Sequence, residues 1–427
     1  MSLRHSLLII LEKLHLIRFM RRVVKYKLPY FRYLQKKRGD SIRKRGYANV
    51  VFVVINLPMW RAQGLYDLLK KDSRFNLYIL MGECKTYTTE ENERNISTMK
   101  RYFQERGMDC YTLDDLDSTL LMKQWNPDVI FYTQPYNGTF SHNVDCTSFK
   151  DRLTVFIPYG FMSVLKDWNY NSFLHNMAWR VYYPTEIHKN NAVKLSICKG
   201  DNVRVVGEPH ADDFLNSENV THKWKDHGDK KRIIWAPHFQ ITPNAMFNRP
   251  SFLWTHDVMV EIAKSYQDKI HIAFKPHPRL YSELCNHPDW GEERAKQYYE
   301  LWDTMPNTQV ETGEFIDLFK ESDALIHDCG SFVAEYMFVC KPCMFLTHDE
   351  ESVEQDLCDF GKKCFHLHDI GRTKEDIIHF IKEVVLNDKD TKLTERKRFY
   401  NEYLIPPYGQ STAMNIYNDM TTSLFGK

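Results

Sequence analysis

The sequence predicts an α/β protein made of two doubly wound domains, each built on a parallel sheet, and three observations lead to this prediction. The chain has 427 residues, more than one domain usually holds. Short apolar runs alternate with longer segments of helical periodicity in both halves. The apolar runs are continuous, which is typical of parallel strands covered on both faces.

Six apolar runs predict the strands of the first half, at residues 49–55, 77–81, 129–132, 154–157, 180–183 and 203–206. Helices are expected near residues 62–71 and 91–106, where apolar residues recur every three or four positions. The first half ends at Gly207-Glu208-Pro209-His210, which we interpret as a structural turn.

Five apolar runs predict the strands of the second half, at residues 232–235, 270–274, 309–311, 324–326 and 343–346. Helices are expected at residues 255–266, 292–302 and 375–386 and from residue 393 onward. Two Rossmann-like halves joined by a linker predict the GT-B architecture, with the active site in the cleft between them.

Composition and charge set the expected domain boundaries. Residues 216–231 are polar and lack apolar periodicity, which predicts the interdomain linker. The expected order is a basic segment at 1–45, an N-terminal acceptor domain at 46–215, the linker at 216–231, a nucleotide-donor domain at 232–400, and a C-terminal helix at 401–427 that crosses back to the first domain.

The first 45 residues carry most of the positive charge. They hold eight arginines and six lysines, but only Glu12 and Asp40 as acids. Leu3, Leu7, Ile10, Leu14 and Ile17 fall on one helical stripe, although Arg21 and Lys25 interrupt it. The favoured interpretation is an interfacial helix on an anionic membrane surface. A helix packed on the protein's own body and a contact with nucleic acid or another partner are the alternatives.

Other compositional features limit the function classes. Hydrophobic residues make up 43% of the chain, which excludes general disorder. No run of 18 apolar residues occurs, so no spanning helix is expected. The ten cysteines lack zinc-ligand spacing; the one close pair, Cys340 and Cys343, is expected to be free thiols in a reducing compartment.

Residues 324–342 carry the most informative motif, a short apolar run followed by His327, Asp328 and a turn. Gly330 is expected to allow the sharp turn, and Ser331 to cap a helix reaching about residue 339. Free N–H groups at that helix start attract phosphate, and Glu335, one turn later, can accept hydrogen bonds from a ribose diol. The alternative is an ordinary strand-to-helix turn with a surface glutamate.

Two further segments follow predicted strands of the second half. Lys275-Pro276-His277-Pro278-Arg279 places three cationic or protonatable side chains at a strand end, where they can neutralise a diphosphate. His277 would protonate a leaving phosphate oxygen. His238 ends the strand before it and would face the same cleft. The alternatives are a rigid exposed loop and a surface histidine.

In the first half, Tyr159 follows the predicted strand at 154–157 and could position an acceptor. A tyrosine is a poor general base near pH 7, because its ordinary pKa is about 10.

Together these segments resemble the CDP-glycerol glycerophosphotransferase family, which includes teichoic-acid polymerases and capsule transferases. Five motifs occur in the family's order: Gly207-Glu208-Pro209-His210 (G-x-P-R), Ile234 to Phe239 (Y-A-P-T-F-R), Lys275 to Pro278 (K-P-H-P), Asp323 to Ser331 (D-x-L-I-(S/T)-D-Y-S-S) and Tyr408 to Thr412 (D-G-K-A-S). The resemblance runs from about residue 49 to the C-terminus.

The resemblance implies a bacterial enzyme peripheral to the cytoplasmic face of the cell membrane. It would transfer a glycerol-phosphate or related alditol-phosphate unit from a CDP-linked donor to a lipid-linked or glycan acceptor. The polymer would be teichoic acid-like or a capsule. The resemblance calls for no cofactor, metal or nucleic acid.

The resemblance also assigns roles to residues. Lys275, His277 and Arg279 would hold the donor pyrophosphate, with His277 aiding departure of CMP. The turn and helix start at Asp328, Gly330, Ser331 and Glu335 would contact phosphate or ribose, and Ser411 would cap a phosphate-facing helix.

Two positions depart from the family pattern. Tyr159 stands where the family's W-H-G motif has a histidine regarded as the catalytic base, and Gln240 replaces the arginine of Y-A-P-T-F-R. Loss of a general base lowers the rate by about 10² to 10⁴. A GT-B glycosyltransferase using a nucleotide sugar and a noncatalytic membrane-bound assembly partner are therefore the alternative functions.

Overall fold

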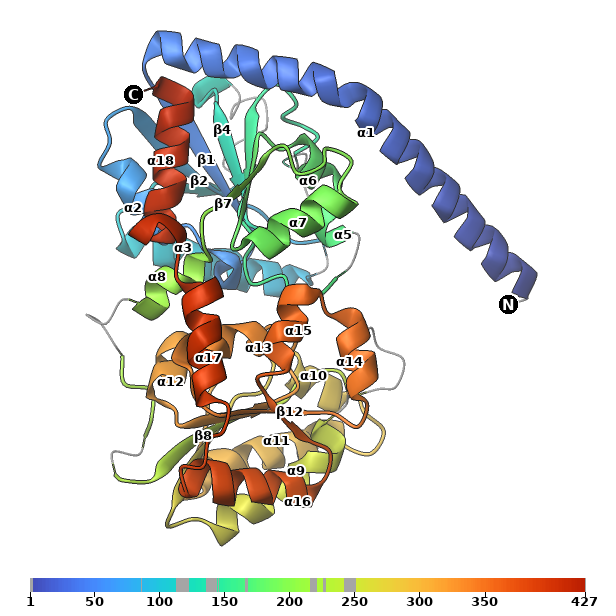
Figure 1. Cartoon of the computed structure of the whole chain (residues 1–427), viewed down its shortest axis with the longest axis vertical. Coiled ribbons are helices and arrows are strands. Elements are labelled where there is room, and N and C mark those ends of the chain that lie inside the picture. The colour runs from blue at the N-terminus through green and yellow to red at the C-terminus, as the bar shows by residue number, and fades with distance from the viewer. Residues whose placement is uncertain are drawn as a thin grey trace. The chain divides into compact units, whose positions relative to one another are not determined.

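The computed structural model describes residues 3–85, 87–112, 123–135, 144, 146–165, 168–215, 221–225, 228–241 and 251–426, with side chains from residue 22 onward except at Trp168. The chain forms two compact units (Figure 1). The first unit comprises residues 1–160, 166–212 and 406–427, and the second comprises residues 161–165 and 213–405.

The first unit is built on a seven-stranded parallel sheet of order β3-β2-β1-β4-β5-β6-β7. Its strands are β1 (Ala48–Val54), β2 (Phe75–Met81), β3 (Cys110–Thr112), β4 (Val129–Tyr132), β5 (Leu153–Phe156), β6 (Arg180–Tyr183) and β7 (Val203–Val205). All six predicted strands are present. β3 was not predicted, because it has only three residues and none is fully buried.

The helices of the first unit are α1 (Leu3–Arg45), α2 (Gln63–Lys70), α3 (Thr89–Glu105), α5 (Trp168–Asn171), α6 (Phe173–Met177), α7 (Glu186–Leu195), α8 (Pro209–Leu215), whose last residues belong to the second unit, and α18 (Thr412–Phe425). Short 3-10 turns lie at Leu57–Met59 and Pro407–Gly409. α3 begins with a capping box between Thr88 and Glu91, which satisfies two terminal N–H groups.

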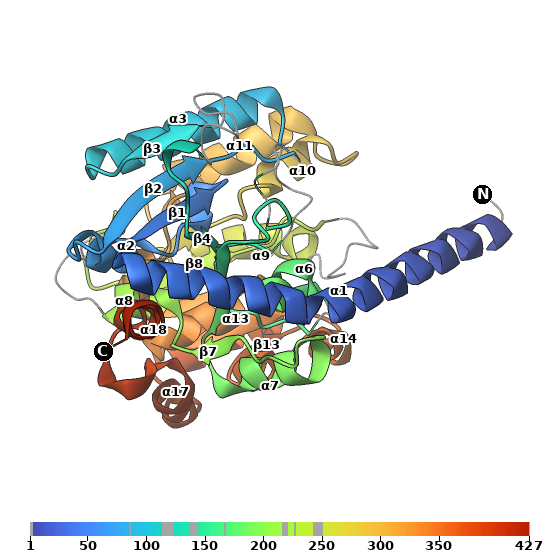
Figure 2. The same ribbon diagram turned by 90° about the horizontal axis from the view of Figure 1, so that it is seen from above.

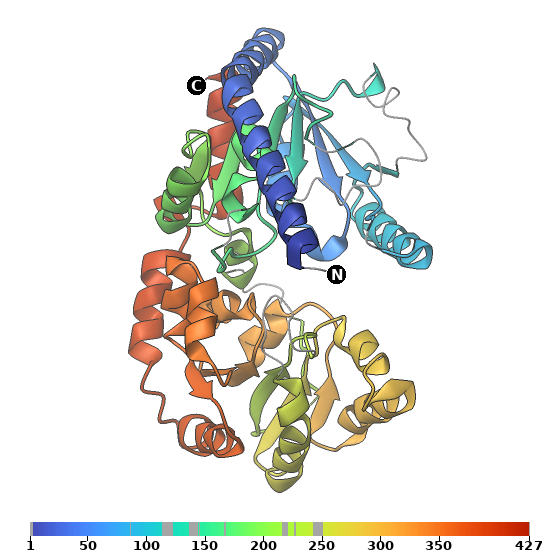
Figure 3. The ribbon, with the colours of Figure 1, turned by 90° about the vertical axis from the view of Figure 1, so that its right-hand side faces the viewer.

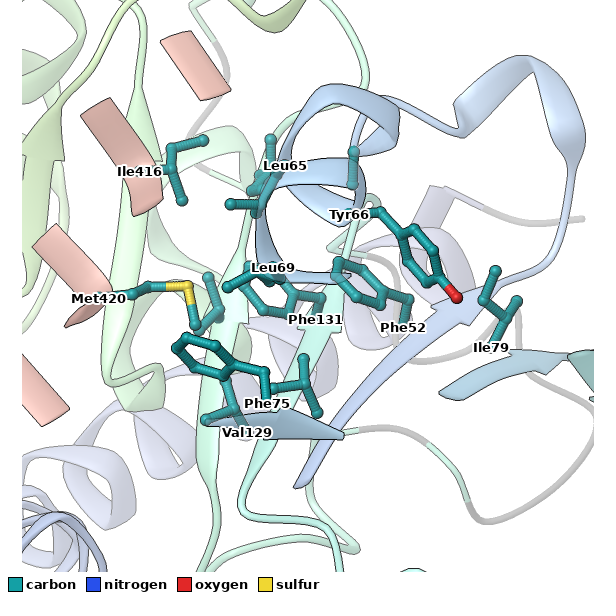
Figure 4. Packing of buried hydrophobic residues seen from close by; sticks show 14 of the residues in the cluster. Phe52, Leu65, Tyr66, Leu69, Phe75, Ile79, Val129, Phe131, Ile416 and Met420 are labelled. Carbon is teal, nitrogen blue, oxygen red and sulfur yellow. The ribbon is translucent and has the colours of Figure 1, made fainter. Parts of the chain in front are cut away.

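The core of the first unit combines strands with the chain's last helix (Figure 4). Phe52 of β1 stacks on Phe131 of β4, with ring centroids 4.7 Å apart. Ile416 and Met420 of α18 are buried in the same cluster as Leu69 of α2. Residues far apart in sequence therefore share one apolar core.

Gly207 makes the close approach of α18 possible. Its φ of +99° is in the region that favours glycine, and a Cβ there would lie 2.6 Å from Thr412 Oγ1. The N–H groups of Thr412 and Ala413 donate to the Asp212 carboxylate, at 2.7 and 2.9 Å. The expected turn at 207–210 is therefore the place where the C-terminal helix begins to pack.

The second unit contains a six-stranded parallel sheet of order β10-β9-β8-β11-β12-β13, with helices on both faces (Figure 3). Its strands are β8 (Lys231–Ala236), β9 (Ile270–Phe274), β10 (Thr308–Val310), β11 (Ala324–His327), β12 (Cys343–Leu346) and β13 (Asp369–Gly371). All five predicted strands are present, and only the short β13 was missed.

The helices of the second unit are α9 (Phe252–Ser265), α10 (Leu280–Cys285), α11 (Gly291–Thr304), α12 (Ile316–Glu321), α13 (Phe332–Glu335), α14 (Glu350–Asp356), α15 (Asp359–Phe365), α16 (Lys374–His379) and α17 (Leu393–Phe399). A 3-10 helix at Tyr336–Val339 continues α13, and π-helices at Phe380–Leu386 and Tyr400–Leu404 continue α16 and α17. The predicted helix at 375–386 is thus α in its first half and π in its second.

The expected linker at 216–231 is packed where it is described. Residues 216–220 and 226–227 lie outside the described residues. Trp224 is buried and donates from its indole nitrogen to the Leu318 carbonyl, at 3.3 Å. The N–H of Lys225 donates to Gln309 Oε1, at 2.8 Å. Trp224 therefore fixes the described part of this segment to the second unit, although the polar composition of residues 216–231 predicts a linker.

A short segment before the linker also belongs to the second unit. The Ser163 carbonyl accepts from the N–H of Cys358 at 2.8 Å, and Val164 forms an antiparallel bridge with Leu357. A Cβ on Gly361 would lie 2.2 Å from that same carbonyl oxygen, so glycine permits the contact. Backbone pairing thus places residues 161–165 in the second unit, although the sequence around them belongs to the first.

Candidate functional site

The candidate site of the second unit lies at the carboxyl ends of three neighbouring strands. β9, β8 and β11 are adjacent in the sheet, and the loops that follow them begin at Lys275, Pro237 and Asp328. Ligands of doubly wound proteins bind at this edge. The first two loops meet at their histidines: the rings of His238 and His277 have centroids 5.0 Å apart.

Phe239 and Arg279 complete this cluster. The Phe239 ring lies 4.5 Å from the ring of His277, and the guanidinium carbon of Arg279 lies 4.2 Å from the Phe239 centroid. Arg279 also pairs with Glu283 at 2.7 Å, one helical turn later. The structure therefore brings together His238, His277 and Arg279, three of the predicted site residues, and adds Phe239 as their common support.

Backbone hydrogen bonds set the orientation of both histidine rings. Nδ1 of His277 accepts from the N–H of Arg279 at 3.1 Å, and Nδ1 of His238 accepts from the N–H of Gln240 at 3.4 Å. A neutral imidazole that accepts at Nδ1 carries its proton on Nε2. For His277, whose ring is neutral, this geometry assigns an Nε2–H donor, which suits the oxygens of a phosphate group.

The charge state of His277 follows from its surroundings. Burial and, to a smaller extent, the neighbouring Arg279 guanidinium lower its pKa from 6.5 to about 4. The ring is therefore neutral at pH 7. It donates a hydrogen bond in this state, and an approaching anion would raise its pKa.

Lys275 occupies a different position from the one expected of a pyrophosphate ligand. Its side chain is buried, and Nζ donates to the Gly313 carbonyl at 2.6 Å. Burial lowers the pKa of this lysine, although Glu311 and Glu314 act in the opposite direction. Lys275 positions the loop after β10.

The Asp328 carboxylate also forms its hydrogen bonds with other residues of the protein. One carboxylate oxygen accepts from the N–H of His238 at 2.6 Å, and the other accepts from the N–H and Oγ of Ser251, at 3.2 and 2.6 Å. Burial raises the pKa of this carboxyl to about 6. Asp328 therefore joins the His238 loop to the start of α9. Ser251 was not among the predicted site residues, although its position shortly before the predicted helix at 255–266 could have indicated a role at the start of that helix.

The turn after β11 corrects two expectations. Gly330 is not among the described residues with positive φ, and a Cβ there would meet no atom within 4 Å. Ser331 has helical dihedrals, φ −74° and ψ −39°, and its side chain makes no capping hydrogen bond. The turn therefore requires neither residue for its backbone shape, and the space beside Gly330 is open.

The helix and the glutamate of the motif at residues 324–342 agree in part with the sequence prediction. The helical stretch does reach Val339, where Cys340 ends it with φ +54°. Glu335 is buried, so the alternative of a surface glutamate is wrong. Ser163, which the sequence reasoning missed, donates from Oγ to the Gly330 carbonyl at 3.1 Å and supports the turn.

Two predicted site residues belong to the first unit. Tyr159 follows β5 and is partly buried, and its carbonyl accepts from Nε of Arg61 at 2.8 Å. Ser411 caps α18, because its Oγ accepts from the N–H of Met414 at 3.1 Å. No local sequence pattern indicates a role for Arg61.

Comparisons with known proteins give a family match and fold relatives. Residues 180–418 match the model of the family described as CDP-glycerol:poly(glycerophosphate) glycerophosphotransferase. A teichoic acid glycerol-phosphate primase of Bacillus spizizenii is 24% identical over 227 residues, which are 48% of this chain and 53% of that protein. The chain thus spans about half the length of this curated relative.

Two solved structures share the fold. A variant of the wall teichoic acid polymerase TagF superposes with a TM-score of 0.55 at 13% identity, covering 96% of this chain and 99% of that one. UDP-GlcNAc 2-epimerase from Neisseria meningitidis, bound to UDP-GlcNAc, gives 0.55 at 13% identity, covering 87% and 99%. These likenesses confirm the predicted GT-B fold class.

Proposed function

Because the chain belongs to the CDP-glycerol:poly(glycerophosphate) glycerophosphotransferase family, we propose that it transfers a glycerol-phosphate or related alditol-phosphate unit from a CDP-linked donor. The acceptor is lipid-linked or a glycan, and the product is a teichoic acid-like or capsule polymer. The matched range, residues 180–418, contains every predicted donor residue, and this observation carries the proposal. The teichoic acid primase relative supports it.

In the proposed reaction, an acceptor hydroxyl attacks the phosphorus of the alditol-phosphate group, and the hydroxyl proton passes to solvent water as the new P–O bond forms. The bond from that phosphorus to the bridging oxygen breaks, and CMP leaves with the electron pair. The Nε2–H group of His277 donates to a diphosphate oxygen, the neighbouring His238 ring lines the same site, and Arg279 supplies positive charge. The bound diphosphate raises the pKa of His277, so the ring takes up a proton and can pass it to CMP.

The remaining predicted residues fit this scheme as positioning groups. Asp328 and Lys275 hold two of the loops, through the contacts to Ser251 and Gly313. A Cβ on Gly330 would meet no atom within 4 Å, and a phosphate or ribose is proposed to bind there, near Ser331 and Glu335. Ser411 orients the start of α18 in the first unit.

Tyr159 is proposed to position the acceptor hydroxyl rather than to deprotonate it. Its phenol is a weak base at pH 7. Departure of CMP assisted by His277 lowers the demand for a base, because a metaphosphate-like transition state requires little nucleophilic push.

The test is nucleotide release by the full chain with CDP-glycerol and a lipid-linked acceptor. CMP release is expected, and His277→Ala is expected to lower it by about 10² to 10⁴. Tyr281→Ala, in an exposed residue on α10, is the control for nonspecific damage. Release from UDP- or GDP-sugars with a new glycosidic bond, and none from CDP-glycerol, would contradict the proposal.

The departures at Tyr159 and Gln240 keep the nucleotide-sugar transferase as the second candidate. The same assay separates the two, because it varies only the donor. For the noncatalytic alternative, the readout is polymer formation in cells. Normal polymer with His277→Ala would support an assembly partner.

The protein is also proposed to act at the cytoplasmic face of the cell membrane, bound peripherally through residues 1–45. Among the helices that the structure describes, none has both the length and the apolar character needed to cross a bilayer. Basic residues near an anionic surface contribute about 1 kcal/mol each, and salt screens them. We expect the full chain to bind phosphatidylglycerol vesicles and to be released by 0.5 M salt.

A further inference from the structure

The second half of α1 is docked on the first unit by one face. Val24, Phe31 and Ile42 are buried there, and Val24 and Phe31 pack with Met177. Arg32 pairs with Asp201 at 2.7 Å and donates to the Ala178 carbonyl at 2.8 Å. Pro29 lies within this helix, and Figure 2 shows α1 from above against α18 and α6, both of which it contacts.

The opposite face of the same helix presents tyrosines to solvent. Tyr26, Tyr30 and Tyr33 expose 82%, 60% and 61% of their surface. Their spacing of four and three residues puts them on one stripe. Tyr33 lies nine residues after Val24, two and a half turns at 3.6 residues per turn, so the stripe faces directly away from the docked side.

The net charge around this stripe is positive. Lys25, Lys27, Lys37 and Lys44 are exposed beside the tyrosines. Asp40 is the sole acid between residues 22 and 45, and it is paired with Arg43 at 3.1 Å. Tyrosine rings with a polar tip are favoured at the headgroup level of membranes, and lysines around them attract anionic lipid. The stripe therefore matches an anionic bilayer in both charge and polarity.

We propose that this outer face, formed by Tyr26, Tyr30, Tyr33, Lys37 and Lys44, lies in the headgroup region of an anionic membrane, with α1 parallel to the surface. The proposal rests on the membrane association proposed above and names the surface that makes the contact. It places the contact on the docked second half of α1, separate from the apolar stripe expected at residues 3–17.

Because α1 is fixed to the first unit, this contact also orients that unit. Arg38 pairs with Asp128 and Asp151, and Arg32 with Asp201, and these acids lie one or two residues before β4, β5 and β7. α1 therefore lies along the amino ends of the parallel strands, and Tyr159 lies beyond a carboxyl end. β5, the strand that Tyr159 follows, has four residues and is about 13 Å long. The reactive end of a lipid-linked acceptor must then extend more than about 10 Å from the bilayer to reach Tyr159.

The test measures co-sedimentation of the full chain with vesicles of 30% phosphatidylglycerol in phosphatidylcholine at 0.1 M salt. The triple variant Tyr26→Ala, Tyr30→Ala, Tyr33→Ala is expected to bind about tenfold more weakly or worse. The matched control is Tyr408→Ala, which removes an equally exposed tyrosine (79%) outside α1 and should bind like the parent. Replacing the three tyrosines by tryptophan should preserve binding, because both rings favour the interface.

The outcomes separate this inference from the membrane proposal. If the parent binds in a salt-sensitive way and the triple alanine variant binds equally well, the contact lies elsewhere and the inference is overturned. If the parent does not bind vesicles at all, membrane association itself fails. A third outcome is that the triple variant loses self-association or RNA binding while its vesicle binding is unchanged. That result would assign the face to a second copy of the chain or to a nucleic acid, and it would also overturn the inference.

Discussion

At the scale of single residues, Asp328 and Lys275 were expected to contact the donor, but both side chains form hydrogen bonds within the protein. Asp328 accepts from His238 and Ser251, and Lys275 donates to Gly313. A buried charge is stable only when it is paired or well hydrogen-bonded, so both residues are tied to the loops they support. Their substitution should therefore change stability as well as activity.

Asp328→Asn tests this role. The amide keeps one acceptor but places an NH₂ group against a donor, which costs about 1 to 3 kcal/mol. We expect a lower urea midpoint together with slower CMP release. Ser251→Ala removes one donor from the same carboxylate and should have a smaller effect of the same sign. Unchanged stability in both variants would show that Asp328 does not hold the loops.

Buried histidines predict a dependence of stability on pH. Burial lowers the pKa of His175 and His368 to about 3 and that of His277 to about 4, from 6.5. Between 6.5 and these values the unfolded chain binds protons that the folded chain does not. The stability that these histidines contribute is therefore complete above pH 6.5 and is lost as the pH falls below it. Urea midpoints from pH 7.5 to 4.5 measure this loss.

The control for that series is His368→Gln, which retains a donor for the Cys364 carbonyl. It should flatten the pH dependence by about one proton relative to the parent. An identical slope in the two proteins would mean that His368 titrates normally in the folded state.

At the scale of elements, glycines decide which segments can meet. Gly207 lets α18 reach the first unit, and Gly361 lets residues 161–165 reach the second. Neither contact is visible in the local periodicity of the sequence. Both arise from backbone approaches closer than a Cβ allows.

Gly207→Ala is expected to destabilise the protein by more than about 2 kcal/mol, because its positive φ and its contact with Thr412 both oppose a side chain. The matched control is Gly39→Ala in α1, where a Cβ meets no atom within 4 Å and alanine favours the helix by about 1 kcal/mol. Urea unfolding measures both. Equal stability of the two variants would contradict the close approach at Gly207.

At the scale of the whole molecule, the chain closes on its first unit with its last helix. Ile416, Met420 and Leu424 are buried in the core of that unit. Arg180 of β6 also pairs with Asp419 of α18 at 2.9 Å. The core of the first unit is therefore incomplete without α18, although all seven strands of its sheet precede residue 206.

Met420→Ala is expected to destabilise the first unit by about 2 to 5 kcal/mol, through a cavity in its core. Hydrogen exchange should then increase in β1 and β4 while β8 and β9 stay protected. Thr422→Ala, on the exposed side of the same helix, is the control. Equal protection of β1 in parent and Met420→Ala would show that α18 is dispensable for this core.

The sequence by itself determined the two parallel sheets, the strand ends that carry the site and the family. Continuous apolar runs can be satisfied only by burial on both faces, and parallel strands bring residues such as His238 and His277 to one edge. Tertiary structure decided what each polar group does there. Contacts between residues distant in sequence determine that Asp328 binds Ser251 and that Ser331 does not cap a helix. Such contacts also determine which unit α18 and Trp224 pack against, and no local pattern encodes them.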